Sequence, residues 1–122
     1  MEKRVGEQLF DAWPDTYDRW FTTPIGTLVK HYESDLILDL LNPGDGELIL
    51  DAGCGTGIFT LDILSAGPRV VGLDLSFPML MRAREKAGSH PFEAVLGDMM
   101  NLPFPEGIFD KVVSITCFEK TE

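Results

Sequence analysis

A glycine-rich turn preceded by an acid is the segment of this sequence best suited to chemistry. Residues 48–57 read LILDAGCGTG, so that an apolar run ends at Asp51 and leads into Gly53, Gly55 and Gly57. Glycine permits a tight turn and lets a ligand touch the main chain. The helix predicted next offers free N–H groups to an anion at its first turn. The pattern indicates a ligand-binding turn, with a purely structural strand-to-helix turn as the alternative.

Two further acids follow apolar runs later in the chain. Asp74 comes after Gly53 at the spacing of about 20 residues at which an acid holds a ribose diol in dinucleotide-binding folds. Asp98 follows Gly97 after a third apolar run. Because the carboxyl ends of parallel strands share one edge of a sheet, we expect these acids to converge there with Asp51. Each acid alone is equally consistent with a solvated carboxylate.

The elements that must position these residues are short apolar strands alternating with helices. Residues 47–51, 69–74, 92–96 and 111–118 read as strands, and residues 58–67 and 76–88 read as helices. Continuous apolar strands in this alternation predict an α/β fold, a parallel sheet with helices on both faces. A chain of 122 residues is long enough for one domain and too short for two.

The N-terminal segment, residues 1–46, is predicted to be a helical cap or lid on the core formed by residues 47–122. Its residues 13–21, WPDTYDRWF, are rich in aromatic side chains, and a turn signal, NPGDG, closes it at 42–46. Between them an apolar stripe repeats every four residues and predicts an amphipathic helix; the stripe consists of Leu28, Tyr32, Leu36 and Leu40.

Composition excludes several classes of protein. Twenty acidic against ten basic residues give a net charge of −10, which disfavours a nucleic-acid or anionic-membrane partner. No apolar run approaches the roughly 18–20 residues of a membrane span, and the N-terminus lacks the apolar stretch of a secretory signal. Cys54 and Cys117 form no CxxC motif and are expected to be reduced thiols in the cytoplasm. His31 and His90 are isolated, so no metal site is expected.

The spacing of the glycines distinguishes between nucleotide cofactors. An NAD site has the pattern GxGxxG, whereas here the third glycine comes four residues after the first and an acid precedes them. The chain resembles the Rossmann-like class of S-adenosylmethionine-dependent methyltransferases: DAGCGTG is similar to their first motif, VVGLDLS to the second, and LGDMMNLPFPEGIFDKVVSI to the third and fourth. YDRWFTTPIG is similar to the lead-in of the small-molecule branch, which includes the quinone-biosynthesis enzymes.

The resemblance implies a strand order of 3-2-1-4 and a sheet that lacks the C-terminal half of the seven-stranded family fold. Strand four is then an edge, and an open apolar edge invites pairing. We therefore expect it to be covered by the same edge of a second copy, giving a homodimer. The resemblance also implies that the partner molecule is a small methyl acceptor.

The resemblance assigns roles around the methionine and ribose portions of the cofactor. Asp51, Gly53, Cys54 and Gly55 would surround the methionine portion, with Asp51 helping to hold its ammonium group. Asp74 would accept hydrogen bonds from both ribose hydroxyls, a charge-assisted contact.

The remaining predicted contacts involve the adenine ring and the cover of the site. Leu75 and Met79 would lie against the ring, and Asp98, after Gly97, would accept from its amino group. Met99 would offer its backbone N–H to a ring nitrogen. The methionine end would be completed by Ile115, Thr116 and the covering ring of Tyr17, whose face near a sulfonium has a cation–π rationale.

The sequence motifs are also compatible with functions other than methyl transfer. Because the sulfonium is already an activated donor, the protein has to align the acceptor and exclude water. The sequence identifies no catalytic residue; His31 is the only histidine considered able to reach the site. A non-catalytic S-adenosylmethionine-binding subunit fits the same motifs, and an NAD-binding oxidoreductase half-domain is disfavoured by the glycine spacing.

Overall fold

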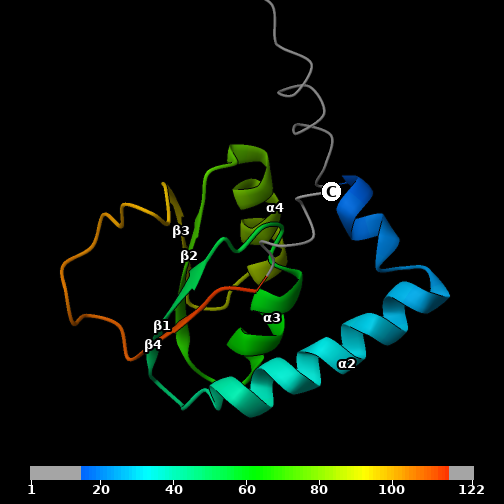
Figure 1. Ribbon diagram of the computed structural model, residues 1–122, viewed down its shortest axis with the longest axis horizontal. Helices are drawn as coiled ribbons and strands as arrows, with labels where there is room; N and C mark the ends of the chain where they lie inside the picture. Colours follow the sequence, from blue (N-terminus) through cyan, green and yellow to red (C-terminus); the bar gives the residue numbers. More distant parts are fainter. Residues whose placement is uncertain (1–14, 116–122) are drawn as a thin grey trace, which may run out of the picture.

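The computed structural model describes residues 15–115, and Figure 1 shows its elements in chain order. Residues 15–20 are helical. They are followed by α2 (Pro24–Leu41), β1 (Leu48–Ala52), α3 (Ile58–Ser65), β2 (Arg69–Asp74), α4 (Phe77–Ala87), β3 (Phe92–Leu96) and β4 (Lys111–Val113). Within this part of the chain, no helix has the length and apolar character needed to cross a bilayer.

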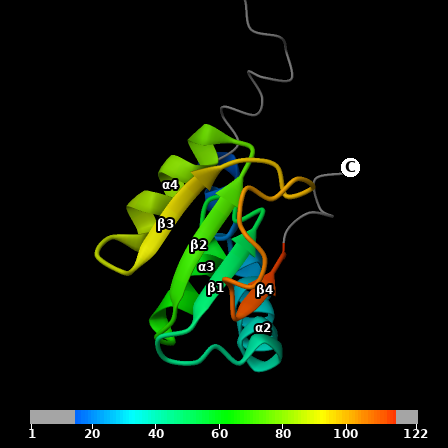
Figure 2. The same cartoon turned by 90° about the vertical axis from the view of Figure 1, so that its left-hand side faces the viewer.

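The four strands form one parallel sheet in the order β3-β2-β1-β4 (Figure 2). At its centre, Leu50 of β1 pairs with Val71 of β2 on one side and with Val112 of β4 on the other. Parallel strands, of which β1, β2 and β3 are joined by helical crossovers, define a Rossmann-like α/β fold, which confirms the predicted α/β class and the strand order.

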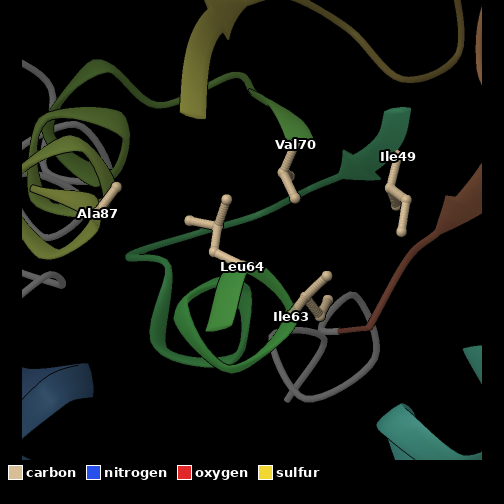
Figure 3. Close-up of a cluster of buried hydrophobic side chains, with 5 residues drawn as sticks. All are labelled: Ile49, Ile63, Leu64, Val70 and Ala87. Carbon is tan, nitrogen blue, oxygen red and sulfur yellow. The ribbon is translucent and has the colours of Figure 1, made fainter. Parts of the chain in front are cut away.

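One face of the sheet is covered by α2, α3 and α4 (Figure 2). A cluster of fully buried apolar side chains joins this face to α3 and α4 (Figure 3), and it consists of Ile49, Ile63, Leu64, Val70 and Ala87. Helix α2 adds Ile37, Leu38 and Leu41 at the margin of the cluster. Burial of these side chains is the main force that holds the helices on the sheet.

The opposite face is covered by a loop where helices on both faces were expected. Leu50 and Leu73, both completely buried, pack against Phe104 and Phe109 from residues 97–110. The rings of Phe104 and Phe109 meet edge-on with their centroids 5.1 Å apart. Prolines at positions 103 and 105 disfavour helical backbone in this loop.

One sequence expectation about the edge of the fold is wrong, namely the length of the fourth strand. The fourth strand ends at Val113, so Ser114 and Ile115 lie outside it, and residues 116–118 lie outside the described part of the chain. The apolar stripe of α2 is exposed: the exposed fractions are 65% for Leu28, 72% for Tyr32, 48% for Leu36 and 78% for Leu40. Leu36 and Leu40 line a groove beside β4.

The orientation of α2 has a polar cause. Lys30 Nζ lies 2.9 Å from Asp62 Oδ2 on α3, and Ser34 donates a hydrogen bond to the same oxygen. These contacts turn the Lys30–Ser34 side of the helix toward α3, together with the neighbouring apolar residues Ile37, Leu38 and Leu41. The four-residue stripe is therefore left on the outside.

Candidate functional site

The turn between β1 and α3 has the backbone that its glycines predicted. Gly53, Gly55 and Gly57 have φ angles of +77°, +59° and +83°, a region that favours glycine. The N–H groups of Gly53 and Cys54 both donate to the carbonyl of Leu73, at 2.7 and 3.1 Å. The turn is thereby fixed to the end of β2, next to Asp74.

Asp74 connects the turn to the start of α4. Its Oδ2 accepts from the Gly55 N–H at 2.8 Å, and its Oδ1 accepts from the Ser76 N–H at 3.0 Å. A carboxylate has about four lone-pair sites, so two remain for a ligand's hydroxyl groups. The half-buried side chain of Asp74 thus keeps acceptor capacity at the edge of the sheet.

Asp51 is a buried carboxylate with one unused oxygen. It is 1% exposed, its Oδ2 accepts from the Thr60 hydroxyl at 2.6 Å, and its Oδ1 has no hydrogen-bond partner among the described residues. Burial raises the pKa of Asp51 to about 6, and the nearby charge of Asp74 contributes to the rise. An anion that is costly to bury and incompletely hydrogen-bonded fits a cationic ligand beside it.

The third acid, Asp98, lies at the corresponding end of β3. The Gly97 N–H donates to the Asp74 carbonyl at 3.0 Å, which holds the end of β3 against β2. Asp98 is exposed, and its Oδ1 accepts from the Met100 N–H at 2.9 Å. The Met99 side chain extends over the turn, because its methyl carbon lies 2.9 Å from where a Cβ on Gly53 would be.

The structure therefore brings Asp51, Asp74 and Asp98 to the carboxyl ends of three adjacent strands, as the sequence predicted. Leu75 is 68% exposed beside Asp74, whereas Met79 is 2% exposed inside the fold.

The main chain of Cys54 forms part of the turn, and its side chain lies in the core. Its thiol packs with Leu80 and Ala83 of α4, and burial raises the pKa of that thiol. Ile115 is half-buried beyond β4, and Thr116 lies outside the described residues.

The aromatic segment before α2 packs on α3. Tyr17 is half-buried and meets Phe21 edge-on with ring centroids 5.2 Å apart. Phe21 in turn meets the buried ring of Phe59 at 5.7 Å. This stacking attaches the segment that carries Tyr17 to the helix that follows the glycine turn.

Sequence reasoning missed a polar cluster beside the turn. Asp18 accepts from the hydroxyl of Thr56, and the cations of Arg82 and Lys86 on α4 lie against the same carboxylate. These contacts link positions 38, 64 and 68 residues apart, and no local pattern signals such pairings.

Comparisons with known proteins identify the family. A methyltransferase-domain family matches residues 49–122, and the chain therefore belongs to this family. It is 34% identical over 113 residues to an uncharacterized methyltransferase of Geobacillus sp. (strain WCH70), covering 90% of this chain and 52% of that protein. It is 35% identical over 113 residues to the demethylmenaquinone methyltransferase of Corynebacterium kroppenstedtii, covering 90% and 47%.

A solved structure agrees with the fold. A protein assigned as an S-adenosyl-L-methionine-dependent methyltransferase from Methanococcus maripaludis superposes with a TM-score of 0.73 at 18% identity, covering 93% of this chain and 52% of that one. The chain spans about half the length of the curated relatives it matches. The cofactor of the family is S-adenosylmethionine. The Asp51 oxygen that lacks a partner among the described residues fits a cationic group of such a ligand.

Proposed function

We propose that this chain binds S-adenosylmethionine at the turn formed by residues 53–57 and serves the transfer of its methyl group to a small-molecule acceptor. The observation that carries this proposal is the pair Asp51 and Asp74, which flank a glycine turn on adjacent strands. A cation balances the buried charge of Asp51, and a diol matches the free lone pairs of Asp74. Membership of the methyltransferase family supports the same assignment.

Each part of the cofactor has proposed partners in the chain. Asp51 acts on the ammonium group, and the main chain of Gly53, Cys54 and Gly55 borders the methionine portion. Asp74 holds the ribose. On this proposal the adenine lies against the exposed side chain of Leu75, with Met79 buried beneath the surface there, and beside Gly97, Asp98 and Met99. Ile115, Thr116 and Tyr17 are the residues proposed for the methionine end.

When bound, S-adenosylmethionine supplies a methyl group already activated for transfer. The chain's own residues then have to bind the cofactor, orient it toward the acceptor and exclude water from the site. These contributions are proximity and desolvation. Asp74 orients the ribose through a rigid carboxylate, because two backbone N–H groups hold that carboxylate in place. The segment around Tyr17 contributes exclusion of water at the turn, because Asp18 binds Thr56 there. No catalytic base is assigned.

A small acceptor is supported by charge and by a relative. The net charge of −10 disfavours a polyanionic acceptor such as RNA. The Corynebacterium relative is named for demethylmenaquinone, a small molecule. The free thiol of Cys54 supports a reducing compartment such as the cytoplasm.

Calorimetry and a transfer assay test the proposal separately. Titration with S-adenosylmethionine, S-adenosylhomocysteine and NAD is expected to show binding of the first two and not of NAD. Incubation with a labelled methyl donor and a panel of small acceptors, quinols included, is expected to label at least one. Cofactor binding without transfer would favour a non-catalytic binding subunit, and binding of NAD alone would overturn the proposal.

We propose further that two copies associate through the edge of β4 that no strand of residues 15–115 covers. Val112 is 60% exposed on that edge. Leu36 and Leu40 of the exposed α2 stripe line a groove together with it. Two-fold pairing of β4 with its copy gives an antiparallel ladder and covers both apolar surfaces. The groove that this pairing would fill measures about 420 Å³, and its apolar lining includes Leu36, Ile37, Leu40, Val112, Val113 and Ile115.

Sedimentation velocity at micromolar concentration is expected to give twice the chain mass of 13.6 kDa. Val112→Lys places a charge on the edge and is expected to give the monomer mass. Met100→Lys alters a side chain that is 86% exposed on another part of the surface and is expected to leave the dimer intact. A wild-type chain that stays monomeric would refute this association.

A further inference from the structure

A charged cluster separate from Asp51, Asp74 and Asp98 joins residues 15–20, the glycine turn of residues 53–57 and helix α4. At its centre is Asp18, whose side chain is 19% exposed. Its Oδ1 accepts from the Thr56 hydroxyl at 2.7 Å, and its Oδ2 lies 2.5 Å from Lys86 Nζ and 3.4 Å from an Arg82 nitrogen. Asp15, one helical turn earlier, pairs with Arg82 as well.

The cluster acts on the turn itself. Thr56 is completely buried within the turn, and its carbonyl accepts a second hydrogen bond from Lys86 Nζ at 3.1 Å. Asp18 thus holds the side chain of Thr56, and Lys86 holds its main chain. Asp18 follows Tyr17 directly, so the same contact sets where residues 15–20 (blue in Figure 1) lie relative to the turn.

The charge balance of the cluster also matters for a cationic ligand. Arg82 and Lys86 bring two positive charges next to a turn that is proposed to accept an ammonium and a sulfonium. The carboxylate of Asp18 lies against both cations and offsets their repulsion of such a ligand. Without that carboxylate, the turn keeps two cations and loses the acceptor of the Thr56 hydroxyl.

We propose that Asp18 is a positioning residue, an electrostatic latch that holds residues 15–20 against the glycine turn and thereby sets the rate at which the cofactor is exchanged. This inference rests on the proposed function, because it takes the turn as the cofactor site. The latch must open for the cofactor to enter and for its product to leave. Since it consists of partly exposed ion pairs, added salt weakens it.

Stopped-flow measurement of S-adenosylhomocysteine dissociation tests the latch. Asp18→Asn is expected to speed dissociation about fivefold to tenfold, the effect of losing a partly exposed ion-pair cluster. Added salt is expected to speed dissociation from the wild type more than from Asp18→Asn. Lys86→Met combined with Asp18→Asn is expected to be no faster than Asp18→Asn alone, because both changes open one latch.

Asp15→Asn is the matched control, because it removes the same charge from the same helix without touching Thr56. It is expected to change the dissociation rate less than about twofold, the effect of losing one exposed ion pair. Equal rates for Asp18→Asn and Asp15→Asn, with unchanged salt dependence, would overturn the proposal. Thermal unfolding of each variant verifies that it is folded.

A ligand-free measurement separates failure of the latch from failure of the proposed function. The chain has two tryptophans, so in a Trp13→Phe background Trp20 alone reports on the segment. Asp18→Asn is expected to increase quenching of Trp20 by acrylamide, and Asp15→Asn is expected to leave it unchanged. If the wild type binds no S-adenosylmethionine, the proposed function fails, while the quenching result still decides whether the latch exists.

Discussion

Asp51→Asn is expected to abolish a pH-dependent loss of stability of about 3 kcal/mol between roughly pH 4 and pH 7. The pKa of Asp51 rises from 3.8 to about 6 on folding, chiefly through burial. The folded state therefore binds the proton more tightly than the unfolded chain, so this group's contribution to stability falls as the pH rises through that interval. A shift of about two units corresponds to about 3 kcal/mol.

Denaturant unfolding at a series of pH values measures this effect as the difference between mutant and wild type. The remaining carboxylates titrate in both proteins, so the difference isolates Asp51. The amide that replaces the carboxylate lowers the free energy of unfolding by a constant amount, because its N–H groups are buried. It adds no dependence of that free energy on pH. Asp35→Asn, which removes an exposed carboxylate from α2, serves as the control. Parallel curves for wild type and Asp51→Asn would contradict the assigned pKa.

The same substitution is expected to weaken cofactor binding at neutral pH by roughly tenfold or more, the loss of one charge-assisted contact. A cationic ligand favours the ionised carboxylate, so wild-type affinity is expected to fall as the pH drops below about 6. Asp51→Asn is expected to lack that dependence. Affinity that stays constant in the wild type between roughly pH 5 and 8 would place the ammonium elsewhere.

Asp74→Ala is expected to weaken S-adenosylmethionine binding by about 2 kcal/mol, roughly thirtyfold, since a hydrogen bond to a charged group contributes about 1.5–3 kcal/mol. The variant is also expected to melt at a lower temperature, because the N–H groups of Gly55 and Ser76 lose their acceptor. Calorimetry and thermal unfolding measure the two effects.

Asp74→Asn separates these two consequences. Its single carbonyl oxygen can accept from one of the two backbone N–H groups, so part of the stability is expected to return while the ribose contact stays impaired. Asp39→Ala, which truncates an exposed acid on α2, is the control for charge alone. A folded Asp74→Ala protein with wild-type affinity would show that the ribose lies elsewhere.

The sequence was most informative where function and local geometry coincide. The turn and the convergence of Asp51, Asp74 and Asp98 followed from glycine spacing and from acids at strand ends, which are local signals. The strand order followed from the resemblance to a known family. The capping of α4 by Ser76, whose hydroxyl accepts from the Met79 N–H at 3.3 Å, was predictable for the same reason.

Features set by distant contacts were not predictable. The outward stripe of α2 depends on how Lys30 and Ser34 meet Asp62 on another helix. The hydrogen bond to Asp51 comes from Thr60 on α3, and the cluster around Asp18 depends on α4. Hydrophobic periodicity identifies an apolar face but does not say which neighbour covers it. The roles proposed for the individual cofactor contacts remain predictions.

The position of β4 has a consequence for the order in which the fold comes apart. It pairs with β1 over three residues, and the contact joins Ile49 to Lys111 across a long stretch of chain. Closing so long a loop is entropically costly, and few ladder bonds offset the cost. Amide protons of β4 are therefore expected to exchange with solvent through local openings, while those of β1 and β2 exchange only when the whole domain unfolds.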